Sequence, residues 1–295
     1  QDNYDSPKLL IKKKYISSQW TSFNLILEDF LKNECRNFTY PTSACLAVAG
    51  PISNNIAKII NLSWNISGIA LKNKFKFKNF ELINDFAVQI YGIPFLKKNQ
   101  YSIIQNGTPY EGANNDFHTI VGAGTGLGIA RGIISESNVK VLASEGGHVE
   151  YSPKSKFEWD LKIWLKKSLN VERISCERIV SGTGLSRIAE WRLSKSDAEN
   201  HPLQNYFKEI KNSDAVRKEL PEKICNLSKE GDQIMAEVER IWLGAYASLL
   251  GDVALQELCH GGLWISGGTA PKHFKNFKSD LFMKQFFDKG RLKDI

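Results

Sequence analysis

An amide followed by a carboxylate closes an apolar stretch early in the chain, in Leu82-Ile83-Asn84-Asp85-Phe86. An aspartate placed there could accept the proton of an alcohol, while the amide of Asn84 holds the same hydroxyl group. The alternative is structural, because Asn and Asp are also preferred caps for a helix beginning at Phe86. Taken alone, the Asn-Asp pair is more typical of such a cap.

A glycine-rich loop is the second candidate, and it reads Gly122-Ala123-Gly124-Thr125-Gly126-Leu127-Gly128. Its glycines let the backbone approach a ligand closely, and its N–H groups could form a nest for an anion. The loop is not a dinucleotide fingerprint, because Leu127 stands where the third glycine would be. It is not a Walker loop either, because no Lys-Ser/Thr pair follows it. The sequence alone leaves a phosphate loop and a tight hairpin turn equally open.

Three more stretches carry polar side chains or paired glycines. Glu145 and His148 flank two glycines, and both could reach a polyhydroxylated ligand from one turn. Glu177 could be a ligand carboxylate, although a charge on a helix surface is more typical of a lone glutamate. Gly267 and Gly268 follow an apolar run, and they could pass beneath a nucleotide base or simply form a strand-to-helix turn. No cysteine or second histidine lies near this histidine in sequence, so we expect no metal site.

The composition excludes several classes of protein. The chain has 295 residues, of which 42% are hydrophobic and 24% charged, which suits about two globular domains. The net charge is +7, but the lysine clusters at 12–14, 72–78 and 272–284 lie near no nucleic-acid-binding signature, so solvated surfaces are favoured. The five cysteines are widely spaced, which favours a reducing cytoplasm over a disulfide framework. No apolar run reaches the length of a membrane span.

The hydrophobic periodicity predicts an α/β protein. We expect strands at 9–14, 44–48, 58–62, 80–83, 119–121, 129–134, 139–142 and 262–266, with the glycine loop joining two of them. We expect helices at 23–33 and 157–169, and a charged, peripheral helical region at 194–232. A long apolar helix is expected at 234–258, where Gly244 and Gly251 share a face that should pack against the sheet. A domain boundary is expected near 90–94.

Together, the five stretches occur in the order and spacing of the bacterial glucokinase family, which lies within the hexokinase and actin-like ATPase superfamily. The resemblance covers about residues 44–290. It implies an α/β, two-domain actin-like ATPase (ribonuclease H-like) fold with an interdomain cleft, a small domain at 1–95 and a large domain at 96–295. It also implies ATP-dependent phosphorylation of glucose at the 6-hydroxyl, with Mg²⁺, in the cytoplasm and feeding glycolysis.

The resemblance assigns roles to individual residues. Asp85 resembles the catalytic base, and the residues resembling the sugar ligands are Asn84, Asp85, Glu145, His148 and Glu177. The loop resembles the second phosphate loop of the family, with Gly122, Gly124, Thr125, Gly126 and Gly128 expected to bind ATP. Gly267 and Gly268 resemble the adenosine motif. Asn61 and Trp64 resemble a weaker signature near the sugar, although core packing is more typical of Trp64.

The sequence also departs from the family pattern. The family's opening Asp-x-Gly-Gly-Thr turn and its C-terminal segment are not found, and we expect the sequence to begin just after that turn. The cysteine-rich zinc motif of the related repressor/kinase group is not found either. Glucose and ATP are the expected partners, without nucleic acid or membrane, and a homodimer stays open. Three alternatives remain: a kinase for another hexose, a non-catalytic sugar sensor or transcription regulator, and an actin-like structural or chaperone ATPase.

Overall fold

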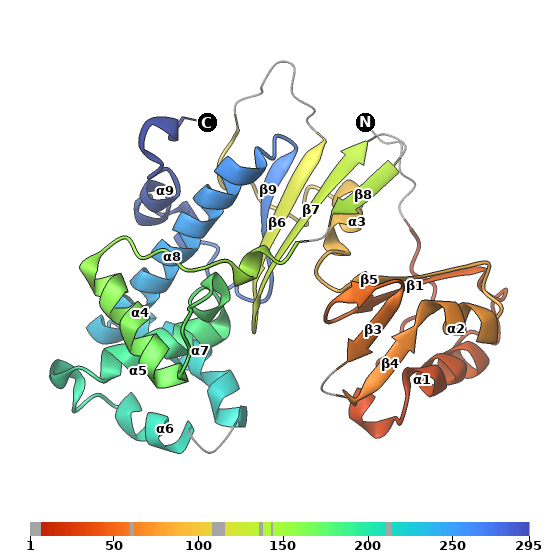
Figure 1. Cartoon of the computed structure of the whole chain (residues 1–295), viewed down its shortest axis with the longest axis horizontal. Helices are drawn as coiled ribbons and strands as arrows, with labels where there is room; N and C mark the ends of the chain where they lie inside the picture. Colours follow the sequence, from red (N-terminus) through yellow and green to blue (C-terminus); the bar gives the residue numbers. More distant parts are fainter. Residues whose placement is uncertain are drawn as a thin grey trace. The chain divides into compact units, whose positions relative to one another are not determined.

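The computed structural model describes residues 7–59, 62–107, 116–135, 138–142, 144–210 and 214–294 (Figure 1). The chain divides into two compact units. Unit 1 comprises Gln1–Tyr101 with Glu136–Val141, and unit 2 comprises Ser102–Ser135 with Leu142–Ile295. The division into a small domain at 1–95 and a large domain at 96–295 stays a prediction.

Unit 1 contains two small sheets. β1 (Ser43–Val48) and β5 (Asn79–Asn84) pair in parallel, with Val48 opposite Asn84. The antiparallel sheet has the order β2 (Ile52–Ser53), β3 (Ile56–Ile59) and β4 (Trp64–Ser67). The helical segments are η1 (Ser17–Gln19), α1 (Phe23–Asp29), the π-helical η2 (Phe30–Glu34), α2 (Gly68–Lys74), α3 (Gln89–Gly92) and η4 (Ile93–Phe95).

The core of unit 1 gathers apolar side chains from both sheets and from α1 and α2, including Ile26, Leu71 and Phe80. Trp64 belongs to this core, as its residue type indicated. The strand predicted at 9–14 is wrong, because residues 7–16 contain no regular structure. A short apolar run cannot by itself supply the hydrogen-bonded neighbour that a strand needs. The strand predicted at 58–62 is observed as Ile56–Ile59.

Unit 2 is built on the strands β7, β6 and β9, which lie side by side in that order. β6 (Phe117–Ala123) and β7 (Leu127–Ser135) form the predicted strand–loop–strand hairpin, with Gly122 opposite Gly128. β9 (Gly262–Ser266) runs parallel to β6 on its other side. β8 (Asn138–Leu142) comes after β7 in the sequence, and its residues up to Val141 belong to unit 1. β9 therefore lies next to β6, the strand that leads into the glycine loop, although the two are far apart in the sequence.

The helices of unit 2 share one hydrophobic core with this sheet. They are α4 (Lys156–Leu169), α5 (Gly182–Leu193), α6 (Leu203–Ile210), α7 (Asp214–Lys229), α8 (Gln233–Glu257) and α9 (Asp280–Phe286), with short 3₁₀ segments η5 (Gly146–His148), η6 (Cys176–Arg178), η7 (Ser196–Ala198), η8 (Asn276–Lys278) and η9 (Gly290–Leu292). Local sequence sets their ends. Ser155 caps α4 by accepting from the N–H of Glu158, and Asp232 caps α8 by accepting from the N–H of Met235.

α8 is the central helix of unit 2, and Figure 1 shows it lying along the sheet. Trp242 and Tyr246 are fully buried on it, and the hydroxyl of Tyr246 donates to the carbonyl of Val121 on β6 over 3.4 Å. A strand and a helix far apart in sequence are thus joined around one core. Across the described part of the chain, no helix combines the length and the hydropathy that crossing a membrane requires.

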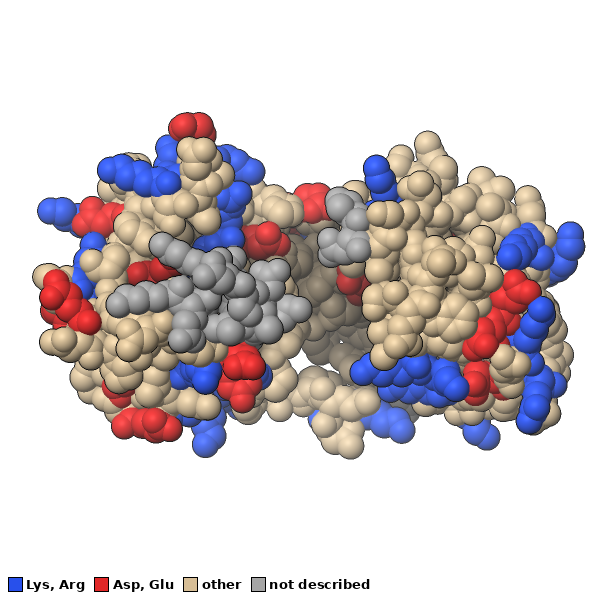
Figure 2. All heavy atoms as spheres, turned by 90° about the horizontal axis from the view of Figure 1, so that it is seen from below, with Lys and Arg blue, Asp and Glu red and all other residues tan. Residues whose placement is uncertain are grey.

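Basic and acidic side chains are interspersed over the face drawn in Figure 2. Members of each lysine cluster pair with glutamates: Lys13 with Glu34 at 2.8 Å, Lys74 with Glu28 at 3.5 Å and Lys272 with Glu222 at 3.3 Å. Each contact offsets one positive charge of its cluster, and the interpretation of the clusters as solvated surfaces stays a prediction.

Candidate functional site

The carboxyl ends of β1 and β5 position Asn84 and Asp85 in unit 1. The N–H of Asp85 donates to the carbonyl of Val48 over 2.9 Å, which extends the parallel pairing by one residue. The side-chain oxygen of Asn84 accepts from the N–H groups of Phe86 and Ala87, both over 3.0 Å. Asn84 therefore caps a turn, and the Asp85 side chain stands exposed just beyond it. The helix that the structural alternative placed at Phe86 is wrong, because α3 begins only at Gln89 and no side chain caps it.

The glycine hairpin lies between β6 and β7 in unit 2. The N–H of Gly124 donates to the carbonyl of Gly126 over 2.8 Å and closes the turn. Within the described part of the chain, the N–H groups of Thr125 and Gly126 form no hydrogen bond. Two such adjacent donors at a turn are what an anion nest needs, so the backbone here fits a phosphate group.

The segment around η6 and the start of α5 holds this hairpin at three points. The N–H of Leu127 donates to Oε2 of Glu177 over 3.1 Å, and the N–H of Gly182 donates to the carbonyl of Gly124 over 2.8 Å. The hydroxyl of Thr183 donates to the carbonyl of Thr125 over 3.0 Å. Glu177 is thus not a free surface charge, because its carboxylate contacts the glycine loop.

The Gly267-Gly268 turn meets the same hairpin from β9. Gly267 has φ of +88°, and a Cβ there would overlap the carbonyl oxygen of Ala123. That oxygen accepts from the N–H of Thr269 over 3.1 Å and from its hydroxyl over 2.8 Å. Gly268 faces open space, since an added Cβ would contact nothing within 4 Å. The two glycines therefore differ in role: Gly267 permits close packing against Ala123, and Gly268 leaves open space beside the turn.

The Glu-Gly-Gly-His turn lies against the start of β7. A Cβ on Gly147 would overlap the carbonyl oxygen of Leu127, so only glycine permits this approach. Glu145 and His148 project from the turn with side chains 75% and 55% exposed, and their Oε2 and Nε2 atoms are 3.7 Å apart. Both side chains are free to meet a ligand.

The structure thus gathers most of the predicted residues around one hairpin in unit 2. They are Glu145, His148, Glu177, Gly267, Gly268 and the loop at 122–128. Asn84 and Asp85 lie in unit 1, and their approach to the other residues stays a prediction. Asn61 lies outside the described residues.

Sequence analysis missed two hydroxyl groups of this region. Thr183 and Thr269 both donate to carbonyl groups of the hairpin. Each stands directly after a glycine, in Ser181-Gly182-Thr183 and Gly267-Gly268-Thr269. A hydroxyl residue after a glycine at the start of a turn or helix is a usable signal, because such side chains often bond nearby backbone.

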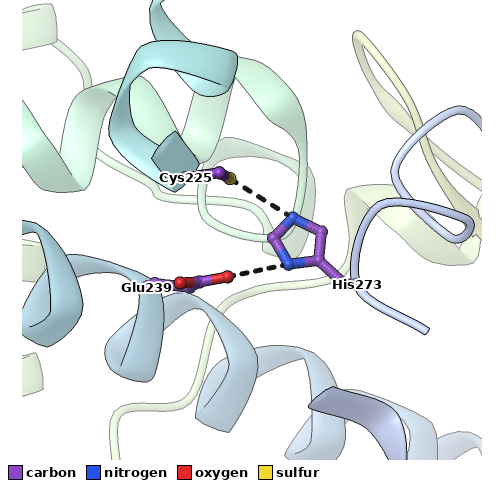
Figure 3. Close-up of side chains that lie close together, drawn as sticks. All are labelled: Cys225, Glu239 and His273. Atoms are coloured by element: carbon purple, nitrogen blue, oxygen red, sulfur yellow. Dashed lines mark hydrogen bonds and ion pairs between the residues drawn. The ribbon is translucent and has the colours of Figure 1, made fainter. Parts of the chain in front are cut away.

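A separate buried cluster joins α7, α8 and the segment after β9 (Figure 3). His273 lies between Cys225 and Glu239: its Nε2 is 3.7 Å from the thiol sulfur, and its Nδ1 is 3.0 Å from a carboxylate oxygen, although not in good hydrogen-bonding direction. Burial raises the pKa of the Cys225 thiol to about 11. Burial alone would raise the pKa of the Glu239 carboxyl too, but contacts with His273 and Ser228 outweigh it and lower that pKa.

The same three residues offer ligand atoms within 4.8 Å of one another, so they could hold a metal ion. The geometry favours a structural role instead. The thiol and the carboxylate face opposite nitrogens of the imidazole, and an ion can bind only one of these nitrogens. Glu239 also already accepts from Ser228 over 2.7 Å and from Asn276 over 3.0 Å. The cluster therefore anchors the segment that follows the Gly267-Gly268 turn.

Comparison with solved structures identifies the class of protein. A glucokinase from an Antarctic psychrotroph is 28% identical, with a TM-score of 0.75 over 95% of this chain and 80% of that one. A ROK family glucokinase from Streptomyces griseus, solved with glucose and AMPPNP, has a TM-score of 0.53 over 92% of this chain and 78% of that one. It is 16% identical, so it bears on the fold alone. The fold is the α/β fold of the sugar kinases in the actin-like ATPase superfamily.

Sequence comparison narrows this class. The glucokinase family model matches residues 2–295. A glucokinase from Synechocystis sp. (strain ATCC 27184 / PCC 6803 / Kazusa) is 32% identical over 98% of this chain and 83% of that protein. Another glucokinase, from Nostoc punctiforme (strain ATCC 29133 / PCC 73102), is 33% identical over 97% of this chain and 84% of that protein. The chain belongs to the glucokinase family.

Proposed function

We propose that this protein transfers the γ-phosphoryl group of ATP to the 6-hydroxyl of glucose, and so supplies glucose 6-phosphate to glycolysis. The observation that carries the proposal is the convergence of the glycine hairpin, the Glu-Gly-Gly-His turn, Glu177 and the Gly267-Gly268 turn in one family member. A phosphate-binding backbone beside polar groups suited to sugar hydroxyls is what a sugar kinase needs.

The nucleotide would lie along the hairpin. The N–H groups of Thr125 and Gly126 would donate to phosphate oxygens, and the open side of Gly268 would leave room for adenosine. MgATP would be the substrate, with Mg²⁺ bound by phosphate oxygens and water, because the hairpin offers N–H donors rather than the oxygen ligands that this ion prefers.

The sugar would be held by Asn84, Glu145, His148 and Glu177, and Asp85 would accept the proton of the 6-hydroxyl as it attacks. Phosphoryl transfer depends mainly on positioning and on charge stabilisation, and orientation alone can contribute roughly 7–11 kcal/mol in favourable cases. A base at Asp85 would add about 10²–10⁴-fold.

The test of this assignment is Asp85→Asn. The amide keeps the shape of the side chain but cannot take the proton, so kcat should fall at least about 10²-fold while glucose still binds. A coupled ADP-release assay measures kcat, and titration calorimetry measures glucose binding. Asp160→Asn, the same change on an exposed residue of α4, is the matched control. Near-normal turnover by Asp85→Asn would remove Asp85 from the mechanism.

The remaining choices are also testable. A panel of glucose, mannose and amino sugars in the same assay would establish the preferred hexose. Thermal stabilisation by glucose would contradict an actin-like structural ATPase, and salt-sensitive DNA binding would favour a transcription regulator. We place the reaction in the cytoplasm, consistent with the free cysteines, and propose light scattering to detect a homodimer.

A further inference from the structure

Glu177 reaches the glycine hairpin with one oxygen only. Its Oε2 accepts from the N–H of Leu127 over 3.1 Å, and a Cβ on Gly126 would lie 2.6 Å from the same oxygen. The other oxygen, Oε1, has no hydrogen-bond partner among the described residues. The carboxylate therefore has one oxygen on the hairpin and one available to a ligand.

The backbone beneath Glu177 is firmly held. Its carbonyl accepts from the hydroxyl of Ser181 over 2.7 Å, and this buried hydroxyl also accepts from the N–H of Gly184 to cap α5. The carbonyl of Ser181 in turn accepts from the indole N–H of Trp242 over 3.0 Å, and Trp242 is fully buried. Because these contacts join η6 to α5 and α8, the backbone that carries the carboxylate is fixed by the core of unit 2.

We infer that Glu177 is a positioning residue for the phosphate-binding hairpin in addition to a sugar ligand, and that it couples the binding of the two substrates. The inference rests on the proposed function. The peptide that Glu177 holds, between Gly126 and Leu127, directly follows the two N–H groups that would meet the phosphates.

Coupling follows from the shared carboxylate. A glycine-rich turn has many conformations, so fixing one of them before the nucleotide arrives lowers the cost of binding. A sugar hydroxyl that donates to Oε1 would hold the carboxylate in place and so hold Leu127. Linkage then requires that sugar and nucleotide strengthen each other's binding by the same factor.

The test measures ADP affinity by calorimetry in the absence of sugar, together with KM for glucose. Glu177→Ala removes the acceptor, so ADP affinity should fall about tenfold, the typical loss for a hydrogen bond to a charged group. Glu177→Gln keeps an acceptor oxygen for Leu127, so ADP affinity should stay within about twofold while KM for glucose rises. Unchanged ADP affinity in Glu177→Ala would overturn the inference.

Two further variants separate this role from general damage. Thr183→Val removes another hairpin contact with nearly the same volume, so it should weaken ADP binding and leave KM for glucose unchanged. Gly126→Ala would push the carboxylate aside and should raise KM for glucose, although Gly126 is no sugar ligand. An unchanged KM for glucose in Gly126→Ala would contradict the coupling, even if Glu177→Ala does not fold. Failure of the unmodified protein to bind ADP would instead count against the proposed function.

Discussion

The sequence presents two alternatives for Asn84 and Asp85, a structural cap and a site that handles a hydroxyl group, and the two residues differ in which alternative they fit. The amide oxygen of Asn84 accepts from Phe86 and Ala87, so it shapes the turn after β5. The same turn leaves the carboxylate of Asp85 exposed. The cap at Asn84 is therefore compatible with the role of catalytic base that we propose for Asp85, because it leaves this carboxylate exposed.

The paired glycines at 267 and 268 should respond differently to the same substitution. Gly267→Ala places a Cβ at φ of +88° and against the carbonyl of Ala123, so we expect a loss of about 1–2 kcal/mol or more and weaker ADP binding. Gly268→Ala adds a methyl group into open space, so stability should change by less than about 1 kcal/mol. Thermal unfolding and ADP titration of both variants check this, and equal melting temperatures would contradict the packing.

Glycine spacing predicted where the backbone comes close to something, but not to what. The glycines at 122–128, 146–147 and 267–268 were all identified from sequence. Only coordinates show that Gly147 and Gly267 approach two ends of the same hairpin, at Leu127 and Ala123. The sequence shows which positions have glycine and can therefore approach another backbone closely. Which backbone they approach is decided by tertiary packing.

At the scale of elements, α8 corrects one prediction. Gly244 and Gly251 share a helix face, but Gly251 does not pack against the sheet as expected. A Cβ there would overlap the carbonyl of Phe286 and the side chain of Lys289, which belong to the end of α9 and the residues after it. Gly244 instead lines a cavity of about 230 Å³. The spacing of the two glycines predicted correctly that they share a face of α8. It could not predict that residues 286–289 pack against Gly251, because that depends on the tertiary structure.

Substitution at these two positions tests the arrangement. Gly251→Ala should destabilise the protein by about 1–3 kcal/mol, because α9 must shift to admit the methyl group. Gly244→Ala has room for the methyl group and should stabilise α8 by about 0.5–1 kcal/mol. Urea unfolding midpoints measure both changes, and destabilisation by Gly244→Ala of similar size would show that the cavity is filled.

At the scale of the whole molecule, stability should depend on pH through His118. Its Nδ1 accepts from the indole N–H of Trp264 over 3.1 Å, across the β6–β9 pair. Burial lowers the pKa of His118 from its ordinary value of 6.5, although nearby Asp116 opposes this. Above pH 6.5 both the folded and the unfolded state leave it neutral. Below pH 6.5 the unfolded state binds the proton first, so folding loses stability until the pH reaches the lowered pKa.

We therefore expect the free energy of unfolding to fall as the pH drops below about 6.5, by less than about 1.4 kcal/mol per pH unit from this residue. His118→Asn retains an acceptor for the indole but does not titrate, so part of the pH dependence should disappear. Denaturant titrations of both proteins at pH 7.5, 6.5 and 5.5 provide the measurement. An identical pH dependence in the two proteins would exclude His118 as its source.

The sequence by itself determined the α/β class, the hairpin around the glycine loop and the family. These depend on residue type and short-range spacing, which a linear chain records directly. Tertiary structure alone decided that Glu177 reaches Leu127 and that Thr183 and Thr269 secure the hairpin. Such contacts join residues dozens of positions apart, and they form only when β6, β9 and α5 pack together around α8.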